Sequence, residues 1–206
     1  MGEIDTDSAQ ISFGQELIRK ATHMGALIIP GAYYGLSLSK SQMLAFLIPA
    51  TVLMIIIDIS RLRNWGFWHA FASKIGSKMI RAHEHAGDFT GATYILLAVC
   101  LTVTLFSKPI AIAALTFIIV GDTLAALIGR RFGRHRFGGK SLEGSGACLV
   151  STVGVSLIIP GLAFEAGIAG AVVATVVEAL PLGIDDNLTV PLLSGLTMTL
   201  MVSLLS

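Results

Sequence analysis

The stretch IAIAALTFIIVGDTLAALI, residues 110–128, decides the fold class of this chain. Its only ionisable residue is Asp122, and it is about as long as the ~20 residues that a helix needs to cross a bilayer. A carboxylate at membrane depth costs roughly 2.5–3.5 kcal/mol on insertion scales, so an acid in such a run is by default a functional group. The stretch therefore predicts a membrane-spanning helix that carries part of a site.

The composition extends this prediction to the whole chain. Hydrophobic residues make up 54% of the 206 residues and charged residues 13%, and the mean hydropathy is +0.80. Soluble domains contain about 25% charged residues, so these values argue against a soluble globular domain. Cys100 and Cys148 lie in apolar runs without metal-ligand or disulfide spacing, and we interpret them as small core residues.

Further apolar runs resemble the first in composition. Together the predicted spans are residues 21–38, 43–59, 91–106, 110–128, 147–162, 166–180 and 188–205. Several are shorter than ~20 residues, so we expect their flanks to extend the helices. The sequence thus predicts an all-α, polytopic membrane helix bundle of about seven transmembrane helices, with residues 1–206 forming a single catalytic domain.

Two segments fall outside these runs. Residues 1–14 are polar and acidic, and they lack the positive charge that precedes the apolar core of a signal peptide, so no cleaved export signal is predicted. Residues 65–85 place Trp68 and Phe71 at helical spacing opposite Lys74. This pattern predicts an amphipathic helix lying in the membrane interface.

The basic residues predict the orientation. When the N-terminus is placed in the cytoplasm and the chain is threaded through seven crossings, only Lys40 and Lys108 of the 14 basic residues fall outside. The acids Asp58, Asp122 and Glu178 fall on the inner side with the other cations. We therefore predict an integral membrane protein whose N-terminus and active site face the cytoplasm, where soluble nucleotides are found.

A basic, glycine-rich segment, GDTLAALIGRRFGRHRFGGKSLEG (residues 121–144), joins the fourth and fifth predicted spans. Its glycines let backbone amides approach an anion, which indicates a phosphate site; contact with anionic lipid head groups is the alternative. GGKS is not a Walker A motif, because Arg134 stands where the motif requires glycine. The phosphate-binding candidates are Arg130, Arg131, Gly133, Lys140, Ser141, Glu143 and Gly144.

An acidic segment, EALPLGIDDNLTVP, occupies residues 178–191. Its polar side chains are Glu178, Asp185, Asp186 and Asn187. Oxygen ligands suit Mg²⁺, which usually takes one or two carboxylates plus substrate phosphates. We predict Mg²⁺ ligation by Asp186, with Asp122 approaching from a facing helix, Glu178 and Asp185 as further ligands, and Asn187 contacting the nucleotide. In the alternative, Asp185 and Asn187 simply cap the last helix.

Two more polar pairs lie at the inner ends of predicted spans. Asp58 and Arg61 are one helical turn apart, so they form either an internal ion pair or a site in which Asp58 orients or deprotonates a lipid hydroxyl and Arg61 contacts phosphate. Arg19 and His23 share one helix face, where they contact phosphate or anchor the helix in the interface.

The order and spacing of these motifs resemble the polyprenol kinase family, which includes dolichol kinase, phytol kinase and CTP-dependent diacylglycerol kinase and is distantly similar to phosphatidate cytidylyltransferases. The matching elements are RKATH (19–23), DISR (58–61), EHAGDFTGATY (84–94) and the basic and acidic segments. The resemblance implies transfer of the γ-phosphoryl group of a nucleotide to a membrane lipid alcohol: a polyprenol, dolichol, phytol, geranylgeraniol or diacylglycerol. The choice of CTP comes from the resemblance alone.

The predicted catalytic residues are Asp58, Asp122, Lys140 and Glu178, with Mg²⁺ as cofactor and CTP as co-substrate. The expected partners are a lipid and a nucleotide triphosphate, without nucleic acid; homo-oligomerisation stays open. One alternative is a cytidylyltransferase, but the element GIDDNLTVP (183–191) lacks the histidine and the basic residue of those enzymes. The other is an anion transporter, against which the one-sided charges and the lack of an internal repeat argue.

Overall fold

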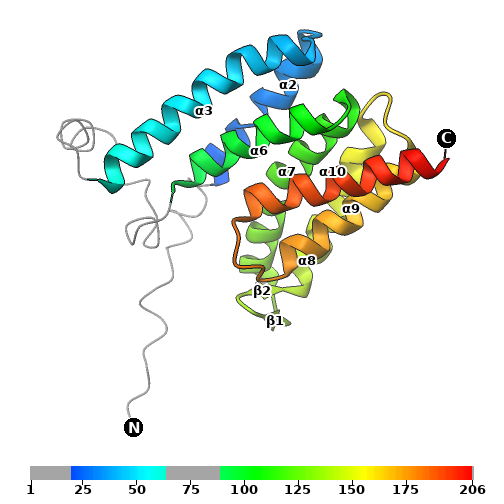
Figure 1. Ribbon diagram of the computed structural model, residues 1–206. Coiled ribbons are helices and arrows are strands. Elements are labelled where there is room, and N and C mark those ends of the chain that lie inside the picture. The colour runs from blue at the N-terminus through cyan, green and yellow to red at the C-terminus, as the bar shows by residue number, and fades with distance from the viewer. Residues whose placement is uncertain (1–19, 64–88, 206) are drawn as a thin grey trace.

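The computed structural model describes residues 20–63 and 89–205, which form helices and one short β-hairpin (Figure 1). The elements are α2 (Ile28–Gly35), α3 (Lys40–Leu62), α6 (Gly91–Leu105), α7 (Lys108–Phe132), β1 (Arg136–Phe137), β2 (Lys140–Ser141), α8 (Leu142–Ile158), α9 (Phe164–Ala179) and α10 (Asp186–Leu205). The all-α prediction is confirmed. The predicted interfacial helix 65–85, the polar segment 1–14 and Arg19 lie outside the described residues.

The prediction of about seven transmembrane helices is wrong in its count. Within the described ranges, three helices are long and apolar enough to cross a membrane, namely α3, α7 and α10. The other predicted spans form shorter helices, with 15 residues in α6, 17 in α8 and 16 in α9. A turn at residues 26–27 interrupts the first, leaving α2 with 8 residues. α9 ends after 16 residues, just before Pro181, and residues before proline disfavour the helical conformation.

The long helix α7 forms the centre of the bundle. Within its apolar window 67% of the residues are buried, against 28% for α3 and for α10. It packs on α8 and α10 and also contacts α2, α6 and α9, whereas α3 lies at one edge against α6 (Figure 1). The outer faces of α3 and α10 carry apolar side chains such as Phe46 and Leu204. Three long apolar helices, two with apolar outer faces, indicate an integral membrane protein.

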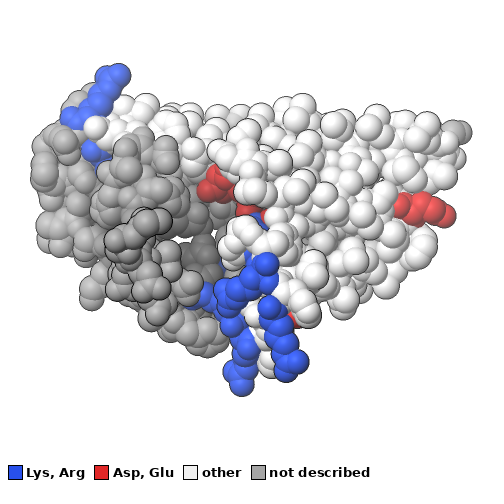
Figure 2. All heavy atoms as spheres, turned by 90° about the horizontal axis from the view of Figure 1, so that it is seen from below, with Lys and Arg blue, Asp and Glu red and all other residues white. Residues whose placement is uncertain are grey.

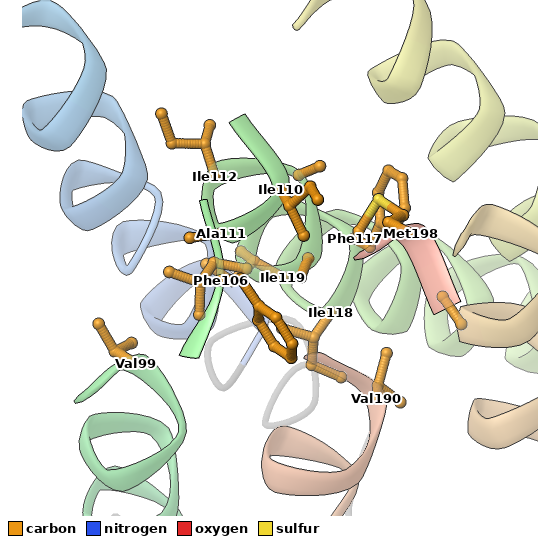
Figure 3. Close-up of a cluster of buried hydrophobic side chains, with 14 of the residues drawn as sticks. Val99, Phe106, Ile110, Ala111, Ile112, Phe117, Ile118, Ile119, Val190 and Met198 are labelled. Carbon is orange, nitrogen blue, oxygen red and sulfur yellow. The ribbon is translucent and has the colours of Figure 1, made fainter. Parts of the chain in front are cut away.

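The core around α7 is drawn in Figure 3. The side chains labelled there are Val99, Phe106, Ile110, Ala111, Ile112, Phe117, Ile118, Ile119, Val190 and Met198. Val99 belongs to α6, Phe106 follows the end of α6, and the others belong to α7 and α10. This core therefore fixes the positions of three helices relative to one another. In lipid, tight van der Waals packing of this kind takes over from the hydrophobic effect as the force between helices.

Glycines bring α7 and α8 into close contact. A Cβ added at Gly144 would stand 2.7 Å from the carbonyl oxygen of Ala125, and one added at Gly121 would stand 2.9 Å from Cys148 Sγ. Both distances are shorter than real Cβ contacts, so a larger residue would push the helices apart. The close approach sets the start of α8, and with it the hairpin, against the cytoplasmic end that we predicted for α7.

Candidate active site

A cavity of about 410 Å³ lies between α7, the hairpin, the start of α8 and the connection from α9 to α10. Its lining residues are Lys20, Asp122, Ala125, Ala126, Gly129, Arg130, Arg136, Gly139, Lys140, Ser141, Gly144, Ser145, Glu178, Asp185, Asp186 and Asn187. Seen from below, the larger group of Lys and Arg side chains lies near the middle of this face, with acidic side chains close to it (Figure 2). The cavity is therefore rich in both signs of charge.

Many of the predicted site residues meet at this cavity, although they come from separate segments. Those that line it are Asp122, Arg130, Lys140, Ser141, Gly144, Glu178, Asp185, Asp186 and Asn187. Arg131, Gly133 and Glu143 lie nearby but are not among its described lining residues. Instead, Glu143 Oε1 lies 2.9 Å from Nδ1 of His135, and this bond lowers the pKa of Glu143 to about 2.

The hairpin positions Lys140 inside the cavity. Gly138 and Gly139 form its turn with φ of +50° and +85°, a conformation that glycine adopts without steric cost. The short strands pair Phe137 with Lys140 and Arg136 with Ser141. We predicted no strand here; the signal in the sequence is the Gly138–Gly139 pair between the dipeptides Arg136–Phe137 and Lys140–Ser141.

Lys140 joins two of the acids. Its Nζ lies 2.9 Å from Glu178 Oε1 and 2.9 Å from Asp186 Oδ2, and it also donates to the backbone carbonyl of Glu178. Burial alone would lower the pKa of Lys140, but the hydrogen bonds and negative charges of Glu178 and Asp186 outweigh it and raise this pKa above its usual value. The lysine therefore remains a cation in the ligand-free protein.

Asp122 is held by a lysine that the sequence analysis did not select. Lys20 Nζ lies 2.5 Å from Asp122 Oδ2, and Lys20 is only 2% exposed. His23 Nε2 lies 3.6 Å from the same oxygen. Lys20 and His23 are three residues apart, a spacing that shares a helix face, so this signal was present in the sequence.

Asp185 begins the last helix. Its Oδ1 accepts hydrogen bonds from the backbone N–H of Asn187 at 2.9 Å and from Asn187 Nδ2 at 2.6 Å. This is the capping arrangement that the sequence analysis held open, and it occurs at the rim of the cavity. Asp185 therefore orients the segment that presents Asp186.

The described residues contain no group of three or more His, Cys, Asp or Glu side chains that could hold a metal ion. The four predicted metal ligands are thus not assembled as one group, because Asp122 contacts Lys20 and Asp185 caps α10. Glu178 and Asp186 remain as a pair on either side of one cation, the ammonium of Lys140. Such a pair suits Mg²⁺ only if phosphates and water supply the other ligands.

Residues at the start of α8 line the cavity. Ser141 is the N-cap residue and accepts a hydrogen bond from Gly144 N at 3.1 Å, and Ser141, Gly144 and Ser145 all line the cavity. Arg130 and Arg136 line it as well. A helix N-terminus flanked by cations favours an anion such as phosphate.

Asp58 lies in a different place and is not a described lining residue of the cavity. It is 1% exposed, and its Oδ1 accepts from Arg61 Nε at 3.1 Å. Its Oδ2 accepts from the backbone N and Oγ1 of Thr90 at 2.8 and 2.9 Å, and from Thr93 Oγ1 at 2.6 Å. Thr90 is the N-cap residue of α6, so Asp58 and Arg61 form the internal pair and tie α3 to the start of α6.

A second, narrow crevice of about 10 Å³ adjoins the cavity. It is lined mainly by apolar residues of α2, α6 and α7, including Ile29, Val99 and Leu115, with His23 and Asn187 as its polar members. Asn187 lines both the crevice and the large cavity. Apolar surface therefore reaches the charged site from the side of α2 and α6.

No family model and no solved structure match the chain. An uncharacterised protein of Rickettsia prowazekii is 32% identical over 91% of this chain and 95% of its own length. The CTP-dependent diacylglycerol kinase 1 of Saccharomyces cerevisiae is 28% identical over 89% of this chain and 72% of its own length. A probable phytol kinase 1 of Glycine max is 33% identical over 55% of this chain, which spans 46% of that protein.

The similarity to the Rickettsia and yeast proteins covers about nine-tenths of this chain. The kinases among them are named for a lipid acceptor, diacylglycerol in one and phytol in the other. The chain belongs to the polyprenol and lipid kinase family.

Proposed function

We propose that this protein is a membrane-embedded kinase that transfers the γ-phosphoryl group of CTP to the hydroxyl of a lipid alcohol, either an isoprenoid alcohol or diacylglycerol. The observation that carries the proposal is the cavity itself, in which cations and a helix N-terminus face the carboxylates of Asp122, Glu178 and Asp186. Phosphoryl transfer depends mainly on positioning and charge neutralisation, and these groups supply both.

The nucleotide would lie along the basic side of the cavity. Arg130, Arg136 and the N–H groups at the start of α8 would bind its phosphates, and the cavity of about 410 Å³ is within the usual range of ~300–1,000 Å³ for small-molecule sites. CTP is proposed because the yeast relative is named for its dependence on CTP.

Mg²⁺ is the expected cofactor, and its chemistry would be to neutralise charge on the phosphates. Glu178 and Asp186 are the residues that would hold it, because they already share one cation and line the nucleotide cavity.

The acceptor would approach from the apolar side formed by α2, α6 and α7, where the crevice of about 10 Å³ would have to widen to admit a lipid. Asp122 lines the cavity, and its Oδ2 lies 3.6 Å from Nε2 of His23, which lines the crevice, so we assign to Asp122 the orientation or deprotonation of the lipid hydroxyl. This is the part that the sequence analysis considered for Asp58, whose carboxylate is instead occupied by Arg61 and two threonines. On the positive-inside rule, we place the cavity on the cytoplasmic side.

The test is incubation of the purified protein with CTP labelled in the γ-phosphate, Mg²⁺ and a panel of polyprenol, dolichol, phytol, geranylgeraniol and diacylglycerol. We expect label in at least one lipid. A parallel reaction with phosphatidic acid and CTP labelled in the α-phosphate separates the alternative chemistry. Lipid labelled from the α-phosphate, with release of pyrophosphate, would establish a cytidylyltransferase, and no labelled lipid from either nucleotide would refute both.

A further inference from the structure

The ammonium of Lys140 uses all of its donors inside the cavity. It has three N–H groups, and it meets three acceptors: Glu178 Oε1, Asp186 Oδ2 and the backbone oxygen of Glu178. Two carboxylates that share one site repel each other unless a cation lies between them. In this structure, Lys140 is that cation.

Lys140 is attached to the fold in a way that allows its charge to move. It follows the Gly138–Gly139 turn on a two-residue strand, and its side chain is 29% exposed, whereas the Glu178 side chain is 7% exposed within its helix. Lysine carries a compact charge on a flexible stem, so a change of rotamer can carry the ammonium to another partner without moving the backbone. Asp186, 33% exposed, stands at the first residue of α10. Glu178 is thus the buried member of this cluster, and Lys140 is the one on a flexible stem.

The charges of the cavity balance. Its cationic lining residues are Lys20, Arg130, Arg136 and Lys140, and its acidic lining residues are Asp122, Glu178, Asp185 and Asp186. A divalent cation that arrives alone at Glu178 and Asp186 meets the ammonium of Lys140. A nucleotide that arrives alone brings its phosphates beside the acids and finds Lys140 already engaged. Like charge disfavours the binding of the cation alone and of the nucleotide alone, whereas together their opposite charges compensate.

We propose that Lys140 holds the place of the divalent cation between Glu178 and Asp186 in the ligand-free protein and moves to the nucleotide phosphates when cation and nucleotide arrive together. This inference rests on the proposed function, because it deepens the account of the same site. It makes Lys140 a competitor of the metal as well as a phosphate ligand, so metal and nucleotide bind interdependently.

The experiment measures Mn²⁺ binding to the purified protein without nucleotide, from the electron paramagnetic resonance signal of free Mn²⁺. Lys140→Gln should bind Mn²⁺ at least about tenfold more tightly than the unmodified protein, because the competing charge has gone. Lys140→Arg should stay close to the unmodified protein. Lys140→Gln combined with Asp186→Asn should lose the gain.

Arg136→Gln is the matched control. It removes one positive charge from the lining of the same cavity, yet the described ion pairs of Glu178 and Asp186 are with Lys140. We expect it to leave Mn²⁺ binding nearly unchanged. Equal affinity in Lys140→Gln and the unmodified protein would overturn the proposal, and so would an equal gain in Arg136→Gln, because that gain would reflect net charge alone.

A measurement on the unmodified protein covers the case in which Lys140→Gln does not fold. Acetylation of Lys140 by an amine-reactive reagent is followed by mass spectrometry with Mg²⁺ alone, CTP alone and both. We expect severalfold protection only with both, and the same protection with either alone would overturn the proposal. Neither readout needs turnover, so kinase activity without these effects would refute this inference and leave the proposed function standing.

Discussion

Acidic side chains lie in two regions of the protein and have different partners in each. Asp58 sits between α3 and α6, where Arg61, Thr90 and Thr93 surround a carboxylate that is 1% exposed. Glu178 and Asp186 line a cavity of about 410 Å³ and share the one positive charge of Lys140, which comes from the hairpin. Asp58 accepts hydrogen bonds from four separate donor atoms of Arg61, Thr90 and Thr93. Glu178 and Asp186 share the single ammonium of Lys140.

This difference separates a structural acid from exchangeable ones. A buried carboxylate surrounded by backbone, hydroxyl and guanidinium donors gains nothing from a new ligand, and removing it leaves those donors unsatisfied. Carboxylates that share a flexible ammonium beside a cavity can exchange that partner for a ligand. An acid inside an apolar run is therefore informative only together with what surrounds it, and the following predictions test that distinction.

The largest expected effect is on stability at Asp58. Asp58→Ala leaves Arg61 and the N-cap residue Thr90 without their common acceptor, and breaking a buried pair in this way typically costs about 3–5 kcal/mol. Thermal unfolding in detergent should show the loss. Asp186→Asn is the control, since its side chain is 33% exposed and we expect its unfolding temperature to stay near that of the unmodified protein.

Next come Asp122→Asn and Asp186→Asn, which should each reduce kcat by on the order of a hundredfold or more, as loss of one preorganised electrostatic group does. Steady-state assays with the accepted lipid measure this, and size-exclusion profiles check that the variants remain folded. Near-normal turnover in both would place the chemistry somewhere other than this cavity.

Gly144→Ala should have an intermediate effect. The added Cβ would stand 2.7 Å from the carbonyl oxygen of Ala125, and forcing atoms into a packed contact usually costs about 1–3 kcal/mol. We expect a lower unfolding temperature and weaker nucleotide binding, because the start of α8 must shift. Gly146→Ala, where a Cβ would meet nothing within 4 Å, is the matched control and should be nearly neutral.

Lys140→Ala should mainly raise the KM for CTP, by roughly tenfold, the equivalent of ~1.4 kcal/mol of lost phosphate contact.

The raised pKa of Lys140 also sets a pH dependence. Because the pKa of Lys140 is higher in the folded protein, its ammonium stabilises the fold fully at any pH below the ordinary value of 10.5. That stabilisation is lost only as the pH rises through the higher pKa of the folded protein. The KM for CTP should therefore not rise through deprotonation of Lys140 between pH 7 and 9, and a rise absent from Lys140→Arg would contradict this.

The smallest effect is expected for His135→Ala. The His135 side chain is 74% exposed and its partner Glu143 is also at the surface, where water and salt screen the pair. The pKa of Glu143 is lowered to about 2, so any contribution of the pair to the stability of the fold is present above the ordinary pKa of 4.5. It is lost as the pH falls toward 2. Activity at pH 7 should match that of the unmodified protein, and a large loss would make His135 part of the site.

The sequence predicted the helical class and much of the cavity, for different reasons. Long apolar runs specify helices directly, so α3, α7 and α10 were found. The glycines and cations of residues 121–144 and the acids of residues 178–191 indicated a common site, and the structure places Lys140 against Glu178 and Asp186. Local composition carried these signals.

What the sequence did not predict depends on contacts between distant segments. The local pattern around Asp58 left two readings open, because Arg61 one turn away fits an ion pair as well as a phosphate contact. Only the partners Thr90 and Thr93, more than thirty residues away, make Asp58 structural. Some helix ends were also predicted wrongly. Residues 26–27 form a turn inside a run of residues that is apolar throughout, and hydropathy alone does not indicate such a turn. Lys20 was not predicted as a site residue because its partner, Asp122, lies 102 residues further along the chain.

The most direct test of the account follows the γ-phosphoryl group in a single turnover. The unmodified protein, Asp122→Asn and Asp58→Asn, each shown to be folded, are mixed with CTP labelled in the γ-phosphate, Mg²⁺ and the accepted lipid. We predict labelled lipid from the unmodified protein and from Asp58→Asn, and almost none from Asp122→Asn. Labelled lipid from Asp122→Asn, with none from folded Asp58→Asn, would contradict the account and move the chemistry to the junction of α3 and α6.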